Sequence, residues 1–174
     1  MAKRILNMTA EEMTHATKSE LIEAIAGSEG RVLASETIGI TIPLLTDVTN
    51  AEFAASMGAD LILLNMFDVQ EPKIMALPEV EKEETVREVK LTGRMVGINL
   101  EPVEESYASD NKETLWEMSA GRYATVENAI QAQKMGVDLI VLTGNPGNGV
   151  SNPAIISSLK AISEAVGEKI MLAA

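Results

Sequence analysis

Two stretches of the chain repeat each other, and this repeat limits the folds that are open to it. Residues 48–64 read VTNAEFAASMGADLILL and residues 126–142 read VENAIQAQKMGVDLIVL, with ten of the seventeen positions identical. Glycine after a helical segment favours a left-handed helix end, and the closing apolar run is typical of a buried strand. Each copy therefore predicts a helix that turns at once into a strand. Duplication and the shared demands of one helix-to-strand corner would both produce this likeness.

Similar units continue along the chain. Short apolar runs predict strands at residues 31–36, 61–66, 95–101, 139–143 and 169–174. Helices are predicted between them, at residues 50–57, 84–91, 126–135 and 153–166. Continuous apolar runs are expected where both faces of a parallel strand are buried. The alternation of strands and helices predicts parallel βαβ units.

The first 29 residues form a separate helical segment in this scheme. Thr9 with Glu12, and Thr17 with Glu20, have the spacing of capping boxes, in which each side chain satisfies a backbone amide of the other residue. They predict one helix or two short ones that end near Gly27. Residues 30–174 are then predicted to form a single domain.

The spacing of the repeat suggests the fold class. An offset of 78 positions spans two βα units of roughly 40 residues each, which is close to the spacing in a (β/α)₈ barrel of about 250 residues. We predict an α/β fold, a parallel TIM-barrel-like arrangement that is truncated after five strands, because the sequence stops at Ala174 where the fifth strand would end. A five-stranded flavodoxin-like open sheet is the alternative.

Composition narrows the classes of partner. The sequence has 26 acidic and 14 basic residues, a formal charge of −12, which argues against nucleic acid and anionic membranes as partners. It has no cysteine, which excludes disulfides and thiolate chemistry. No apolar run approaches the roughly 20 residues of a membrane span, and the N-terminus lacks the apolar core of a signal peptide. We expect a cytoplasmic protein.

Carboxylates follow three of the predicted strands. Glu36, Asp68 and Glu101 stand at strand exits, which is where barrel enzymes place their active sites. Carboxylates at such a face are candidate ligands of Mg²⁺, which prefers oxygen, or candidate acid and base groups. We assign catalytic roles to Glu36, Glu101 and Asn99, and no organic cofactor is implied. The structural alternative is that these carboxylates cap helices or form ion pairs with Lys73, Arg94 or Arg122.

The stretch LTGNPGNGVSNPA, residues 142–154, leaves the fourth strand. Gly144 and Gly149 have the separation of a P-loop, but Val150 and Ser151 follow where that motif needs Lys and Ser or Thr. The stretch is predicted to form one wall of a strand-end site, with Asn152 as the helix N-cap, and plain turn-making is the alternative. The predicted ligand-binding residues are Asn65, Arg122, Thr143, Gly144, Asn145, Gly147 and Asn148.

Four segments together resemble a known family. GRVLASE, GADLILLNMFD, MVGINLEP and GVDLIVLTGNPGNGVSN are similar to an uncharacterised bacterial TIM-barrel family labelled phosphoenolpyruvate-phosphonomutase-like. The resemblance covers most of the chain from Gly30 onward. It implies a barrel related to phosphonomutases and isocitrate lyases, which use Mg²⁺ and α-keto or 2-hydroxy acids. Their Asp-x-Asp-Thr-Gly-Tyr-Gly and Lys-Arg-Cys-Gly-His motifs are absent from this sequence.

Three functional hypotheses follow. The first is a metal-assisted enzyme, lyase- or mutase-like, that acts on a small phosphorylated or carboxylated metabolite. The second is a metal-free sugar-phosphate-binding or isomerase-type barrel that uses helix N-termini to bind phosphate. The third is a non-catalytic chain that associates with itself through unpaired edge strands. The expected partners are a small anionic metabolite and further copies of the chain in a homo-oligomer.

Overall fold

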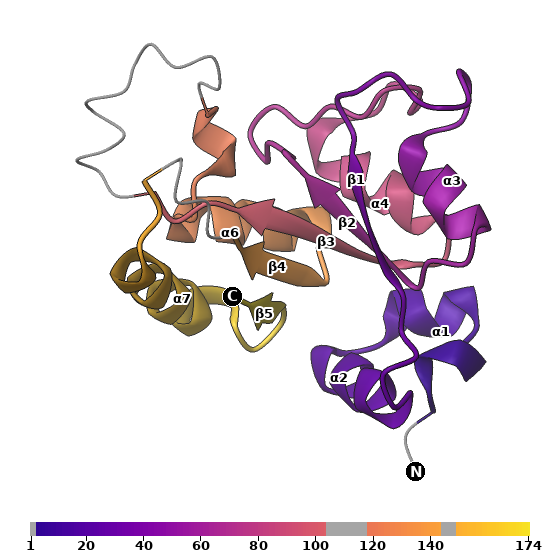
Figure 1. Ribbon diagram of the computed structural model, residues 1–174, viewed down its shortest axis with the longest axis horizontal. Coiled ribbons are helices and arrows are strands. Elements are labelled where there is room, and N and C mark those ends of the chain that lie inside the picture. Colours follow the sequence, from indigo (N-terminus) through magenta and orange to yellow (C-terminus); the bar gives the residue numbers. More distant parts are fainter. Residues whose placement is uncertain (1–2, 104–117, 144–148) are drawn as a thin grey trace.

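The described residues contain five parallel strands, which form a single sheet (Figure 1). The computed structural model describes residues 3–103, 118–143 and 149–174. The strands are β1 (Ala34–Ile38), β2 (Leu61–Asn65), β3 (Met95–Leu100), β4 (Leu139–Leu142) and β5 (Met171–Ala173). They lie in the order β1-β2-β3-β4-β5, and every neighbouring pair is parallel.

This strand order decides between the two predicted arrangements. Consecutive strands lie side by side, as they do in a (β/α) barrel, whereas the flavodoxin-like order is 2-1-3-4-5. The sheet formed by the described residues does not close, because β1 and β5 are both edge strands. The α/β class and the barrel-like succession of parallel strands are therefore confirmed.

In the described part of the chain, four helices cover one face of the sheet. They are α3 (Asn50–Ser56), α4 (Thr85–Lys90, preceded by the 3₁₀ turn η2, Lys82–Glu84), α6 (Val126–Met135) and α7 (Asn152–Val166). Alternate sheet residues such as Ile62, Ile98 and Ile140 pack against them in the main hydrophobic core. The alanines of the repeat, at positions 51, 54, 129 and 132, are buried in this core and let the helices approach the strands closely.

The N-terminal segment packs against the other face. It contains η1 (Ile5–Asn7), α1 (Ala10–His15) and α2 (Lys18–Gly27), so two short helices form. Both predicted capping boxes are present. Met13, Leu21 and Ala24 form a second core with Leu61, Met95 and Met171, which lie at the amino ends of their strands. The segment therefore covers the amino-terminal end of this face and leaves the carboxyl end uncovered by it.

The two copies of the repeat form the same helix-to-strand turn. Gly58 and Gly136 both have positive φ, 98° and 88°, after α3 and α6. The aspartates that follow make matching bonds to the preceding strand in the sheet. Asp60 accepts a hydrogen bond from the Leu33 amide through Oδ2 (2.8 Å) and donates its own amide to the Leu33 carbonyl (2.8 Å). Asp138 does the same with Val96, at 2.9 and 2.8 Å. The identical sequence thus encodes an identical link between neighbouring strands.

Three local predictions are wrong. β1 begins at Ala34 and not at Arg31, because residues 28–31 form a turn in which the Arg31 amide donates to the Ser28 carbonyl (3.1 Å). β1 is also not buried on both faces, since it is an edge strand with exposed residues. The N-cap of α7 is Ser151, whose hydroxyl accepts from the Ala154 amide, while Asn152 lies inside the helix.

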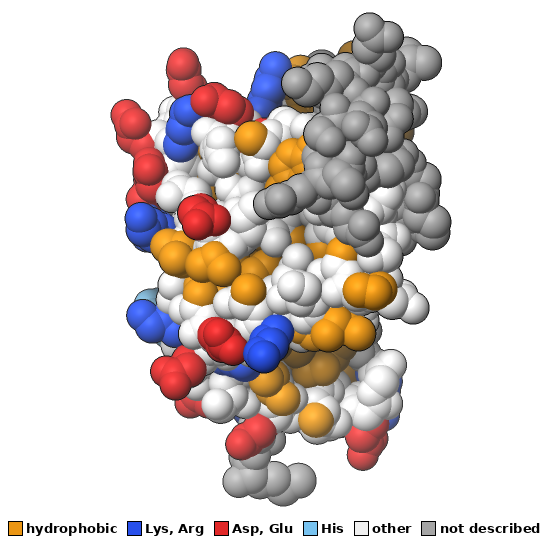
Figure 2. All heavy atoms as spheres, turned by 90° about the vertical axis from the view of Figure 1, so that its left-hand side faces the viewer, with side chains coloured by type: hydrophobic (Ala, Val, Ile, Leu, Met, Phe, Trp, Pro, Cys, Tyr) orange, Lys and Arg blue, Asp and Glu red, His pale blue; other side chains and the backbone are white. Residues whose placement is uncertain are grey.

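The β5 edge presents apolar surface. A groove beside it lies between α2 and α7, and its lining includes Ile22, Leu139 and Leu172. Figure 2, which faces the side of α7, shows hydrophobic side chains gathered across the middle of this surface. In the described part of the chain, no helix has the length and apolarity needed to cross a bilayer.

Candidate functional site

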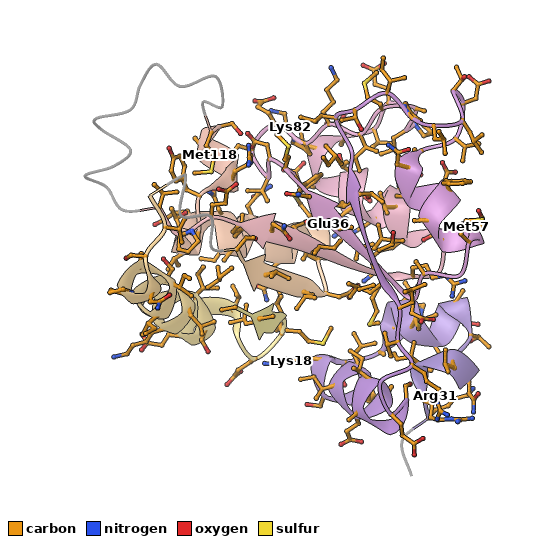
Figure 3. All side chains as sticks on the ribbon, in the orientation of Figure 1. Lys18, Arg31, Glu36, Met57, Lys82 and Met118 are labelled. Atoms are coloured by element: carbon orange, nitrogen blue, oxygen red, sulfur yellow. The ribbon has the colours of Figure 1, made fainter. Side chains whose placement is uncertain are left out.

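Polar side chains from three neighbouring strands share the face that the outer helices do not cover. Register places Glu36 beside Leu63, and Leu63 beside Gly97. Asn65 and Asn99 each lie two residues further along their strands, and side chains two residues apart in a strand point to the same face. Glu36, Asn65 and Asn99 therefore meet toward the carboxyl ends of β1, β2 and β3. Figure 3 shows Glu36 projecting from β1 toward the middle of the sheet.

Asn99 is the centre of this group. Its Nδ2 donates to Glu36 Oε1 (3.0 Å) and lies 3.4 Å from Asn65 Oδ1. Asn99 is only 7% exposed, yet its Oδ1 is buried without a hydrogen-bond partner among the described residues. A buried acceptor that has no partner costs roughly 1–3 kcal/mol. The carbonyl oxygen of Asn99 is therefore buried and lacks, among the described residues, the donor or cation that such an atom normally has.

The chain is strained next to this group. Met66, which follows Asn65, has φ of 58°, in the left-handed region that residues other than glycine rarely adopt. Asn65 stabilises this conformation because its Oδ1 accepts the Met66 amide at 2.8 Å. That bond also fixes the orientation of the Asn65 side chain, so its oxygen faces Asn99 Nδ2. Strain of this kind concentrates at ligand sites, where the surrounding structure holds it in place.

A buried ion pair lies at the end of β3. Arg122 Nη2 donates to Glu101 Oε1 at 2.5 Å, and the two side chains are 15% and 11% exposed. The backbone adds two bonds, from the Glu101 amide to the Arg122 carbonyl and from the Ala124 amide to the Glu101 carbonyl, both 2.9 Å. The pairing of Glu101 with Arg122, which the sequence left as an alternative to a metal-binding role, is thus present.

Three residues that the sequence analysis missed position Arg122. Arg122 ends the 3₁₀ turn η3 (Ala120–Arg122). Asn128 of α6 is buried and donates to the carbonyls of Ala120 and Tyr123, at 2.8 and 2.9 Å. Its Oδ1 accepts from Gln70 Nε2 at 3.0 Å. Gly121 packs so tightly against the 68–70 loop that a Cβ there would lie 1.7 Å from Asp68 Oδ1. The signal for Asn128 was its place in the repeat, where it corresponds to Asn50, whose Oδ1 accepts the Leu44 amide at 3.1 Å.

Asp68 has a structural role in the same loop. Its Oδ1 accepts the backbone amides of Gln70 (2.7 Å) and Glu71 (2.9 Å). Burial raises the pKa of Asp68, but the hydrogen bond from Ser119, those two amides and the nearby charge of Arg122 outweigh it and lower the pKa below its ordinary value. The Asp68 carboxylate therefore holds the loop that packs against η3.

This lowered pKa predicts a pH-dependent contribution to stability. We expect Asp68→Asn to lower the free energy of unfolding by about 1 kcal/mol at pH 7. Because the pKa of the folded state lies below that of the unfolded state, the contribution is fully present above roughly pH 4 and is lost as the pH falls through the lowered pKa. Urea denaturation at pH 7 and pH 3 measures the difference, with Asp47→Asn, at an exposed position, as the control. A difference that does not shrink at pH 3 would contradict this role.

The remaining predicted site residues divide into two groups. Thr143 directly follows β4, is half-buried and donates its amide to the Leu100 carbonyl at 3.1 Å. Gly144, Asn145, Gly147 and Asn148 lie outside the described residues.

Among the residues that the structure does describe, no three His, Cys, Asp or Glu side chains gather in a group that could hold a metal ion. Glu36, Asp68 and Glu101 therefore do not form one three-carboxylate cluster.

The fold and this group of side chains define an α/β protein of parallel βα units with polar residues at the strand exits. The chain belongs to the family described as Domain of unknown function (DUF7916), whose model matches residues 6–174. No curated protein matches it. Among solved structures it is similar to a "putative alpha-N-acetylgalactosaminidase" from Bacillus halodurans C-125, with 12% identity and a TM-score of 0.45. That match covers 82% of this chain and 47% of the other, so the chain spans about half the length of that protein.

Proposed function

We propose that the protein is a metal-assisted enzyme, lyase- or mutase-like, that acts on a small carboxylated or phosphorylated metabolite at the carboxyl ends of β1, β2 and β3. The observation that carries this proposal is the buried Asn99 carbonyl oxygen, which has no partner among the described residues. Buried polar groups are nearly always satisfied in folded proteins, and exceptions call for a water, an ion or a ligand. The surrounding residues supply the groups that such a reaction needs.

Glu36 is the proposed acid or base. Glu36 is exposed, so a substrate can reach its carboxylate. The Asn99 side-chain amide donates a hydrogen bond to one of the carboxylate oxygens. A carboxylate placed in this way can take a proton from carbon or oxygen in a bound substrate. Of the three predicted metal ligands, Asp68 is bonded to backbone amides and Glu101 to Arg122, whereas Glu36 is bonded to the Asn99 side-chain amide.

Arg122 is the proposed anion-binding group. A guanidinium has five N–H donors in a plane, and its bond to Glu101 uses one of them. The ion pair keeps the side chain ordered beside β3, while the backbone bonds and Asn128 fix its turn. A carboxylate or phosphate of the substrate would be bound by the remaining donors. This geometry supports a positioning role for Glu101, which holds Arg122 in place.

The donor set at Asn99 suits a hard cation only in part. Mg²⁺ commonly takes one or two carboxylates and completes its octahedral shell with water and substrate oxygens. Glu36, Asn65 and Asn99 offer one carboxylate and amide oxygens, whereas Glu101 and Asp68 are bonded to Arg122 and to backbone amides. Mg²⁺ would here be held by Glu36 and Asn99 and would stabilise negative charge that develops on the substrate.

The metal-free hypothesis is the second candidate, and one observation favours it. The described residues contain no three-ligand group, and a hydroxyl of a sugar phosphate would satisfy Asn99 Oδ1 as well as a cation would. The self-association hypothesis is supported by the two unpaired sheet edges and by the apolar groove beside β5.

Calorimetry with Mg²⁺, in the presence and absence of oxalate or inorganic phosphate, tests the proposal. We expect saturable Mg²⁺ binding that weakens at least tenfold in Glu36→Gln, about 1.4 kcal/mol, and is unchanged in Glu83→Gln, an exposed position away from the site. Arg122→Gln should weaken binding of the anion and not of the metal. Anion binding that is independent of Mg²⁺ would select the metal-free candidate. Equal Mg²⁺ affinity in Glu36→Gln and the parent protein would overturn the metal-assisted one.

A further inference from the structure

A cavity lies between α3 and α4, on the other side of the sheet from Glu36, Asn65 and Asn99. Its volume is about 470 Å³, and its walls come from these two helices, from the loop at Leu77 and Pro78, and from Arg94, which directly precedes β3. None of the strand-exit residues lines it. The cavity is therefore distinct from the site described above, and every residue of its lining is among those that the structure describes.

Arg94 is a cation of this cavity whose Nε is unsatisfied within the described residues, although Glu52 and Glu88 line the same cavity. Its Nε is buried and has no hydrogen-bond partner among the described residues. None of the ion pairs formed within residues 3–103, 118–143 and 149–174 involves it. A buried donor on a charged group is costly when it is unpaired, more so than a neutral one. In a chain with a charge of −12, an arginine left without an acidic partner is conspicuous.

The backbone holds Arg94 in place. Gly93, immediately before it, has φ of 71°, and a Cβ there would lie 2.3 Å from the Cβ of Ala10. The turn is thus packed tightly against the N-terminal segment on one side. Met95, immediately after Arg94, is fully buried in the core that this segment forms with the sheet. The backbone at Arg94 is therefore held in the cavity wall by packing on both sides.

The walls indicate which anion would fit. The Nε–H of a guanidinium and one terminal N–H form a side-on fork that matches the two oxygens of a carboxylate. Glu52 and Glu88 also line the cavity, and their negative charges oppose a multiply charged phosphate. Leu77 and Pro78 give the walls apolar surface, and Leu91, at the rim, is 78% exposed. These features favour a single negative charge attached to an apolar body.

We propose that the cavity between α3 and α4 binds a small apolar monocarboxylate, whose carboxylate contacts the Arg94 guanidinium and whose hydrocarbon part lies against Leu77, Pro78 and Leu91. The site is independent of the function proposed for the strand exits. Ligand binding there would give the Arg94 guanidinium an anionic partner and remove Leu91 from water at the same time. It would also link α3 and α4, the two helices that flank β2.

Binding of hexanoate to the full chain, followed by ligand-observed NMR and calorimetry, tests this proposal. We expect saturable binding that weakens at least tenfold in Arg94→Lys, which keeps the charge and loses the side-on fork. Arg87→Gln, which removes an exposed cation from α4, should bind hexanoate as the parent protein does. Leu91→Asp, at an exposed position that should not disturb folding, should also weaken binding severalfold.

Two neutral or differently charged probes separate this proposal from less specific binding. Hexanamide has the same apolar body without the charge, and inorganic phosphate has the charge without the apolar body. Both should bind at least tenfold more weakly than hexanoate. Equal binding of hexanamide or phosphate, or unchanged hexanoate affinity in both Arg94→Lys and Leu91→Asp, would overturn the proposal.

Discussion

Replacing Asp138 with alanine should lower the free energy of unfolding by roughly 3–5 kcal/mol, the effect of breaking a buried ion pair by removing one partner. Asp138 Oδ1 lies 2.7 Å from Lys90 Nζ, and the two side chains are only 12% and 13% exposed. The substitution would leave the Lys90 ammonium with a single backbone partner, the Gly136 carbonyl at 3.2 Å. It would also leave the buried Val96 amide without its acceptor.

The repeat supplies a matched control for this prediction. Asp60 makes the same backbone bonds to Leu33 but forms no ion pair with any described residue. Asp60→Ala should therefore cost only about 1–2 kcal/mol. A double-mutant cycle with Lys90→Met isolates the pair, and urea denaturation of the four variants measures it. Equal losses in Asp60→Ala and Asp138→Ala would show that the corner bonds, and not the ion pair, carry the stability.

This comparison also shows what the sequence could and could not predict. The helix–glycine–strand corner was readable because its signals are local: a left-handed glycine, an aspartate two residues later and an apolar run. The ion pair of Asp138 was not readable, because Lys90 is distant in sequence and reaches the corner only through the packing of α4 beside β3 and α6. Asp60 and Asp138 look alike in sequence, and only their neighbours distinguish them.

The same division holds at the candidate site. Parallel strands in consecutive order place their exits side by side, so the contacts of Asn99 with Glu36 and Asn65 follow from topology that the sequence pattern indicated. The edge position of β1 did not follow, because an apolar run looks the same whether one neighbour strand is present or two. The surroundings of Asn99 Oδ1 and the hydrogen-bond partners of Asn128 were not predictable. They depend on side-chain directions in loops, which hydrophobic periodicity does not describe.

The turn that carries Arg122 gives the second large effect. Gly121→Ala would place a Cβ 1.7 Å from Asp68 Oδ1, 2.6 Å from its Cγ and 2.7 Å from the Gln70 amide nitrogen. Since two of these three atoms belong to a side chain and the third to backbone that the side chain holds, the 68–70 loop must move. We expect a loss of about 3 kcal/mol in the free energy of unfolding, at the upper end for overpacking. Displacement of η3 should also weaken binding of anions that depend on Arg122.

A second substitution separates this clash from a general weakness of the turn. Asp68→Gly removes the side chain that the new methyl group would meet, so the double variant should be less destabilised than the sum of the two single variants, by 1 kcal/mol or more. Gly27→Ala is the control, because a Cβ at that helical position meets only Arg4 Cγ, at 3.7 Å. It should be neutral or slightly stabilising. If the losses of unfolding free energy in the two single variants simply add in the double variant, the clash with Asp68 is not the cause of the destabilisation. Gly121 would then be required only for its backbone conformation, and Asp68 would not set the position of Arg122.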